Sequence, residues 1–161
     1  MNERSKILVV DDDETIRETV AAILEDEGYN VSTAQDGKEA LDKCNTEFYN
    51  LALIDIRLPD MDGTELLKLL PETTPPMVKI IVTGYPSLQN AVKAVNHGAD
   101  AYLLKPVEAE EILKTIRLQL EKQQQAREYS EQKVAEFIQT RVKELENQKN
   151  LECKMESNTQ K

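Results

Sequence analysis

Five short apolar runs alternate with helical patterns along the first 120 residues, and this alternation limits the possible folds more than any other feature. The runs lie at 7–10, 30–34, 51–54, 80–82 and 101–104. Runs with so few polar residues are typical of strands buried on both faces, as in a parallel sheet. After the first run, Ile16, Val20, Ile23 and Leu24 follow one helix face, and Gly28 is placed to end that helix. Similar patterns follow each later run, which predicts a doubly wound α/β domain with a five-stranded parallel sheet.

The glycines and prolines divide the chain into two parts. All five glycines and all six prolines fall at or before Pro106, so the remainder contains no strong helix breaker. A polar stretch after Leu120 is followed by a helical stripe made of Val134, Phe137, Ile138, Val142 and Leu145. We therefore expect a compact domain over residues 1–120 and a polar helical tail over 121–161. The tail either continues the last helix of the domain or breaks into a second helix.

The apolar stripe of the tail predicts a partner, because isolated helices draw most of their stability from packing. Two copies of the chain could bury it in a coiled coil, although the apolar spacing covers only about two heptads. The sequence leaves open a homodimer through the tail and a helix that binds another protein. We expect no DNA-binding or catalytic output domain in the chain.

The distribution of charge indicates which partners the chain is not expected to bind. The net charge of −10 belongs to residues 1–120, which hold 22 acidic against 12 basic side chains, whereas the tail holds eight of each. Without a basic face to displace counterions from phosphates, binding to nucleic acid is not expected.

The N-terminus has neither a signal-peptide core nor a membrane span, which predicts a cytoplasmic protein. Cys44 and Cys153 lack metal-ligand spacing and are expected to be reduced thiols.

Polar side chains with complementary chemistry follow four of the predicted strands. Asp11 and Asp12 follow the first strand, Asp55 ends the third, Thr83 ends the fourth and Lys105 follows the fifth. Ligands of open parallel sheets bind beyond the carboxyl ends of the strands, so these side chains are expected to share one site. Clustered carboxylates bind a hard cation such as Mg2+. Held beside it, Asp55 could attack phosphorus and become an acyl phosphate, with the Lys105 amine and the Thr83 hydroxyl as partners for the phosphoryl oxygens.

The order and spacing of these motifs resemble the receiver-domain family of two-component response regulators over residues 4–120. Each motif alone is common, but the four together in this order are specific. The matching stretches are Ile-Leu-Val-Val-Asp-Asp-Asp at 7–13, Leu-Ile-Asp-Ile-Arg-Leu-Pro-Asp-Met-Asp-Gly at 53–63, Ile-Val-Thr-Gly-Tyr-Pro at 81–86 and Ala-Asp-Ala-Tyr-Leu-Leu-Lys-Pro at 99–106. The resemblance implies a CheY-like, flavodoxin-like (βα)5 fold.

The resemblance also implies a set of site residues and partners. Asp11, Asp12 and Asp55 would hold Mg2+ together with the backbone carbonyl of Arg57, and the peptide bond before Pro106 would be cis. Asp55 would accept a phosphoryl group from a sensor histidine kinase. The chain would then be a phosphoacceptor, an enzyme only in promoting its own phosphorylation and slow dephosphorylation.

A switch is implied by the same resemblance. Thr83 would move toward the phosphoryl group and Tyr102 would rotate inward, which alters the surface made by the fourth helix, the fifth strand and the fifth helix. An unidentified downstream protein or a second copy of the chain would bind there. From the residues alone, Tyr102 is equally an ordinary half-buried strand aromatic. Asp13 is expected to cap the first helix, and the turn residues 59–63 to shape one wall of the site.

Two rival interpretations differ in which acid matters. Residues 11–15 also fit the DxDxT pattern of haloacid-dehalogenase-like phosphatases, with Asp11 as nucleophile and Asp13 as general acid. That class needs a further acidic pair after the lysine at the end of another strand, where residues 107–161 show only helical pattern, and it leaves Asp55 without a role. A receiver that serves only as an unphosphorylated scaffold is the other rival, and the complete set of acids, Thr83 and Lys105 counts against it.

Overall fold

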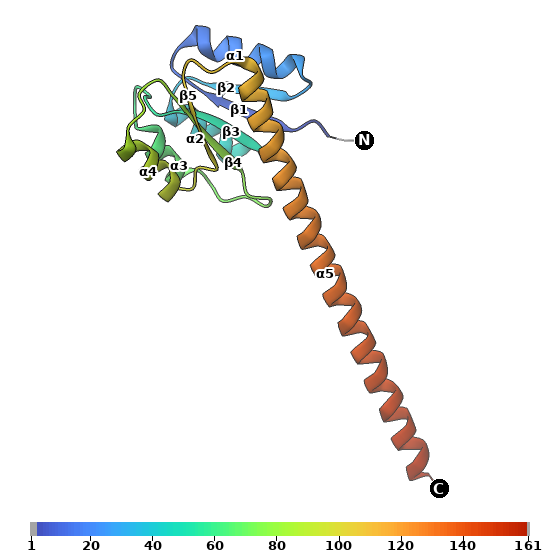
Figure 1. The fold of residues 1–161 in the computed structure, drawn as a ribbon. Helices are drawn as coiled ribbons and strands as arrows, with labels where there is room; N and C mark the ends of the chain where they lie inside the picture. Colours follow the sequence, from blue (N-terminus) through green and yellow to red (C-terminus); the bar gives the residue numbers. More distant parts are fainter. Residues whose placement is uncertain (1–2, 161) are drawn as a thin grey trace. The chain divides into compact units, whose positions relative to one another are not determined.

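The computed structural model describes residues 3–160, in which strands and helices alternate as the sequence predicts (Figure 1). The strands are β1 Lys6–Val10, β2 Asn30–Ala34, β3 Leu51–Asp55, β4 Val78–Thr83 and β5 Ala101–Leu104. The helices are α1 Glu14–Asp26, α2 Gly37–Thr46, α3 Gly63–Leu69, α4 Leu88–Asn96 and α5 Ala109–Thr159.

All strand pairs in the sheet are parallel, in the order β2-β1-β3-β4-β5. One core cluster joins α1 and the first turns of α5 to one face of the sheet, through Leu24, Ile112 and Ile116. A second cluster joins α2, α3 and α4 to the other face. The predicted doubly wound (βα)5 fold is thus confirmed, and it explains why β1 and β3 are almost entirely apolar: helices cover both of their faces.

Side-chain caps fix where the helices begin. The carboxylate of Asp13 accepts a hydrogen bond from the Ile16 backbone N–H at 3.1 Å, as expected for the α1 cap. Asp36 and Asp62 cap α2 and α3 in the same way. After α1 the chain turns at Gly28, whose φ of +95° is a left-handed conformation that favours glycine. The Lys105–Pro106 peptide bond is cis, as the family resemblance implies.

Helix α5 continues without a break for 51 residues, which answers the question that the sequence left open about the tail. The chain divides after Gln123 into two units, the α/β domain and the remaining part of α5. Every residue from 124 to 160 is exposed.

No helix in the described residues combines the length and the apolar character that crossing a membrane requires. The cytoplasmic location stays a prediction.

Candidate functional site

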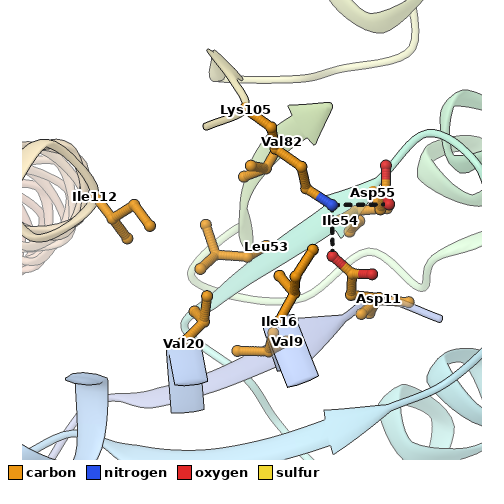
Figure 2. Close-up of a pocket in the computed structure, with 11 residues that line it drawn as sticks. Val9, Asp11, Ile16, Val20, Leu53, Ile54, Asp55, Val82, Lys105 and Ile112 are labelled. Atoms are coloured by element: carbon orange, nitrogen blue, oxygen red, sulfur yellow. Dashed lines mark hydrogen bonds and ion pairs between the residues drawn. The ribbon is translucent and has the colours of Figure 1, made fainter. Parts of the chain in front are cut away.

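The carboxyl ends of β1, β3 and β5 bring three of the predicted site residues into direct contact. Strand register places Val10 beside Ile54, and Thr83 beside Leu104, so the residues that follow these strands meet at one edge. The Lys105 amine reaches back into that edge and lies 2.7 Å from Asp11 Oδ2 and 3.0 Å from Asp55 Oδ2. Figure 2 shows this amine between the two carboxylates.

The acidic side chains form a cluster suited to a hard cation. Asp11, Asp12 and Asp55 each offer a carboxylate oxygen, and these oxygens lie within 4.8 Å of one another. Asp11 and Asp55 are buried, whereas Asp12 is exposed at the mouth of the cluster. Mg2+ prefers a few carboxylate oxygens with open positions for water and phosphate, so this donor set fits the ion.

The electrostatics of the cluster depend on the lysine. Burial raises the pKa of the Asp55 carboxyl, and the hydrogen bond and charge of Lys105 offset part of that rise. Burial by itself would lower the pKa of Lys105, but hydrogen bonds from its amine to Asp11 and Asp55 raise that pKa above the ordinary value of 10.5. Lys105 is therefore cationic at neutral pH and balances charge that the two buried carboxylates would otherwise leave uncompensated.

Apolar side chains close one side of the site. A cavity of about 30 Å³ lies beside the lysine, with Asp11 and Asp55 at its polar end (Figure 2). Its apolar walls include Ile16, Val20, Leu53, Val82 and Ile112. Because these walls keep bulk water from one side, the charges of Lys105 and its two partners interact more strongly than at an open surface.

Thr83 and Tyr102, the predicted switch residues, lie on neighbouring strands. Thr83 is fully buried and its Oγ1 accepts a hydrogen bond from the Tyr85 backbone N–H at 3.0 Å. Tyr102 packs against the core cluster on the α3 and α4 side. Its hydroxyl is buried and makes no well-formed hydrogen bond within the described part of the chain; burial raises its pKa, and the nearby backbone of Ser87 offsets part of that rise.

Arg57 and Tyr85 flank the site, as their places in the sequence beside Asp55 and Thr83 predict, and the structure adds a direct contact between them. The Arg57 guanidinium stacks on the Tyr85 ring, with its central carbon 3.4 Å from the ring centroid. Both side chains are exposed, and the Arg57 backbone N–H points to Asp55 Oδ1 at 3.4 Å. The pair therefore stands at the rim of the acidic cluster. Arg57 lies two positions after Asp55, and Tyr85 lies two positions after Thr83. That common offset is the only signal in the sequence for their contact.

The loop between β3 and α3 is tied to its surroundings by two aspartates that do not point to the cluster. Asp60 accepts hydrogen bonds from the backbone N–H groups of Gly37 and Lys38, both at 2.9 Å, which adds a second carboxylate at the start of α2. These bonds lower the pKa of Asp60. Asp62 accepts a hydrogen bond from the Thr64 backbone N–H at 2.8 Å. That this loop shapes one wall of the site stays a prediction.

Comparison with known proteins defines the class of this α/β domain. The model of the response regulator receiver domain family matches residues 7–117, which is more than half of the chain. The chain therefore belongs to the receiver-domain family of two-component response regulators. Members of this family bind Mg2+ at an acidic pocket, and the Asp11, Asp12 and Asp55 cluster is the corresponding feature here.

Individual relatives agree with this assignment. A CheY-like receiver domain protein from Methanospirillum hungatei is 48% identical, with a TM-score of 0.75, and the match covers 77% of this chain and 99% of that one. The beryllofluoride-activated NtrC4 receiver domain dimer is 39% identical, with a TM-score of 0.69 over 73% of this chain and 98% of that one. The transcriptional regulatory protein DltR of Streptococcus agalactiae is 39% identical over 70% of this chain, which spans half of the DltR length.

The geometry argues against the phosphatase interpretation. In that interpretation Asp13 would donate a proton, yet its carboxylate caps α1. The metal-binding group that the structure brings together in the described residues contains Asp55, which that interpretation leaves unused. The family match points the same way.

Proposed function

We propose that Asp55 accepts a phosphoryl group from a sensor histidine kinase and that the chain signals by protein contact. The observation that carries this proposal is the Lys105 amine, which bridges the buried carboxylates of Asp11 and Asp55 at the strand ends. A cation held at this position can also reach an oxygen of a phosphoryl group bonded to Asp55. Thr83 and Lys105 act in phosphoryl binding, and Asp11, Asp12, Asp55 and the Arg57 backbone carbonyl are the proposed ligands of Mg2+.

The transfer itself needs one bond to form and one to break. A carboxylate oxygen of Asp55 attacks phosphorus, the bond from phosphorus to the donor nitrogen or oxygen breaks, and the leaving group keeps the electron pair. Mg2+, when bound, supplies positive charge beside the phosphoryl oxygens. The Lys105 amine partners a second oxygen, and the Thr83 hydroxyl, once released from the Tyr85 backbone N–H, donates to a third. Return to the free state requires only attack by water on the acyl phosphate.

We propose that Thr83 and Tyr102 carry the signal to the surface of α4, β5 and α5. The place of Tyr102 supports this role: it lies on β5 beside Ile81 and packs against the core cluster on the α3 and α4 side, so a change in its side-chain position would alter the surface next to α4. Leu88, Val95 and Leu104 are large apolar side chains that lie exposed on α4 and β5. Such a surface suits an apolar partner protein or a second receiver. We propose that residues 1–120 form the receiver domain and that residues 121–161 form its helical extension.

The intact mass of the chain tests the phosphoacceptor proposal directly. After incubation with a small acyl phosphate and Mg2+, the native chain is expected to gain one phosphoryl group, and Asp55→Asn is expected to gain none. Asp11→Asn distinguishes the two interpretations, because it keeps the proposed acceptor Asp55 but removes the nucleophile of the phosphatase interpretation. An adduct that persists in Asp55→Asn and disappears in Asp11→Asn would support the phosphatase interpretation. A folded native chain without any adduct would identify an unphosphorylated scaffold.

The stack of Arg57 on Tyr85 is expected to prolong the life of the acyl phosphate. It stands at the rim beside Asp55, where it obstructs the approach of water. Arg57→Ala and Tyr85→Ala should each increase the rate of dephosphorylation several-fold. Since both act through one contact, the double variant should exceed the larger single effect by little.

A cation–π pair in the tail provides a control for this prediction. Lys133 lies 5.5 Å from the centroid of the Tyr129 ring, in the tail and outside the site. Tyr129→Ala should leave the rate of phosphate release unchanged. Release rates that stay at the native value in both Arg57→Ala and Tyr85→Ala would show that the stack does not control access of water.

A further inference from the structure

The part of α5 after Gln123 is helical, but the contacts within it contribute little to the stability of the helix. Residues 124–160 are all exposed. The ion pairs within this segment join Arg127 to Glu131 at 3.2 Å and Arg141 to Glu144 at 3.0 Å. Such pairs contribute only about 0.2–0.5 kcal/mol each, and solitary helices of ordinary composition are marginal in water. A partner that buries apolar surface would supply the missing stability.

Four apolar residues in the middle of this segment follow a heptad pattern. Ile138 and Leu145 lie seven residues apart and occupy one heptad position, and Ala135 and Val142 occupy the other. Together they make a continuous line on one side of the helix, which we call the seam. The side chains of Ile138, Val142 and Leu145 are about half exposed, at 54%, 47% and 46%. The seam therefore offers apolar surface to a second helix.

Charged residues extend the same two heptad positions beyond the seam. Glu128 and Glu131 precede the seam, and Lys149 and Glu152 follow it, each seven residues from a seam residue. These four residues are exposed in the described chain. They would face the corresponding positions of a second helix, so their signs decide how two copies can align.

A parallel dimer in register would place each of these charges against its own copy. Glu128, Glu131, Lys149 and Glu152 would then make four like-charge pairs, two at each end of the seam, and like charges across an interface are costly. In an antiparallel dimer centred between Ile138 and Val142, Glu131 of each chain faces Lys149 of the other. These two opposite-charge pairs flank the apolar centre. The two like-charge pairs, Glu128 of each chain with Glu152 of the other, fall farther out, at the ends.

The sizes of the seam side chains favour the same orientation. In the parallel dimer Ala135 would face Ala135 and leave a gap, while Leu145 would face Leu145. In the antiparallel dimer Ala135 faces Leu145 of the second copy, so a small side chain meets a large one. Facing positions that combine large and small side chains fill the space between two helices more evenly. Ile138 then faces Val142 at the centre.

We propose that the tail binds a second copy of this chain as an antiparallel helix pair, centred on the seam of Ala135, Ile138, Val142 and Leu145. The charges of Glu131 and Lys149 set the orientation. The tail as a whole carries equal numbers of acidic and basic residues, so two copies carry no net repulsion in this part.

Sedimentation equilibrium of the full chain over a range of concentrations tests the dimer. The native chain is expected to associate reversibly into dimers, and Ile138→Asp is expected to remain monomeric at the same concentrations. Leu151→Asp is the control, because Leu151 is equally apolar and exposed on α5 but lies outside the two seam positions. A native chain that stays monomeric, or a dimer that Leu151→Asp and Ile138→Asp affect equally, would overturn the proposal.

Charge reversals test the orientation. Glu131→Lys and Lys149→Glu should each weaken an antiparallel dimer, since each puts like charges together. The double variant should recover native association, and an equimolar mixture of the two single variants should form mixed dimers. In a parallel dimer each reversal exchanges one like-charge pair for another, so single variants with native association would overturn the proposed orientation.

The receiver surface provides the last comparison. Leu88→Asp on α4 is expected to leave the dimer intact, while far-ultraviolet circular dichroism verifies that each variant keeps its helix content. A dimer that Leu88→Asp abolishes and Ile138→Asp preserves would assign association to the α4, β5 and α5 surface and reject the tail. This outcome is independent of phosphorylation, because the phosphoryl adduct on Asp55 is measured separately.

Discussion

Replacing Gly63 with alanine is expected to lower the free energy of unfolding by roughly 1–3 kcal/mol, the range typical of overpacked interiors. A Cβ at this position would overlap the backbone carbonyl oxygen of Asp55 and lie 2.9 Å from the Cα of Ile56. Both atoms belong to the main chain, which cannot relieve the overlap by a change of rotamer as a side chain can. The Gly63 backbone N–H also donates to the Ile56 carbonyl at 2.6 Å, so any displacement weakens a buried hydrogen bond.

The same substitution should reduce phosphorylation, because the displaced backbone belongs to the residue that carries the acceptor carboxylate. Urea unfolding measures the first effect, and the yield of adduct measures the second. Gly84→Ala is the matched control: its Cβ would meet Lys105 Cβ at 3.8 Å, an ordinary contact. Alanine there should be neutral or slightly stabilising, since it restricts the unfolded chain. Equal stability of the two variants would show that the β3–α3 loop can shift without a loss of unfolding free energy.

The sequence predicts the sheet and the acidic cluster because both depend on local pattern. Apolar runs identify buried strands, and a parallel sheet brings the residues that follow β1, β3 and β5 to one edge without further information. Asp11, Asp55 and Lys105 are 44 to 94 residues apart in the chain, yet their meeting follows from topology alone. The cap formed by Asp13 is predictable for the same reason, since it requires only the residues that begin α1.

Other contacts depend on how loops pack, and no local pattern encodes them. Asp60 caps α2 from a loop 23 residues later in the chain. The stack of Arg57 on Tyr85 joins loops after two different strands. The constraint on Gly63 arises where α3 passes against the end of β3. Each contact is set by the path of a loop in three dimensions, so the residue types suggest a turn but not its partner.

Lys105 and Mg2+ would compete for the carboxylates of this cluster. The Lys105 amine already contacts the carboxylates that Mg2+ would bind, so the ion and the lysine share the same negative charge. Because these carboxylates raise the pKa of Lys105 above 10.5, the stability that the lysine contributes is present below pH 10.5. It is lost as pH rises through the raised pKa of the folded state. The difference in unfolding free energy between the native chain and Lys105→Met, measured without Mg2+, should shrink in that pH range.

Lys105→Met is expected to change stability, metal affinity and phosphorylation in distinct directions. Without Mg2+, the variant should lose about 3 kcal/mol of stability, because the two buried carboxylates lose the cation that bridges them. The same unbalanced charge should tighten Mg2+ binding roughly tenfold or more, since a cation within a few ångströms no longer opposes the ion. Titration calorimetry measures this affinity without reference to phosphorylation.

Adduct formation on Lys105→Met at saturating Mg2+ should nevertheless slow by about 100-fold, because one phosphoryl oxygen loses its partner. Tighter metal binding combined with slower phosphorylation separates a direct role of Lys105 from an indirect one through the metal. Lys114→Met removes an exposed lysine of α5 and controls for net charge. If Lys105→Met bound Mg2+ more tightly and was phosphorylated at the native rate, Lys105 would serve only as the counter-ion of the resting cluster. The phosphoryl group would then depend on Mg2+ and Thr83 for its charge balance.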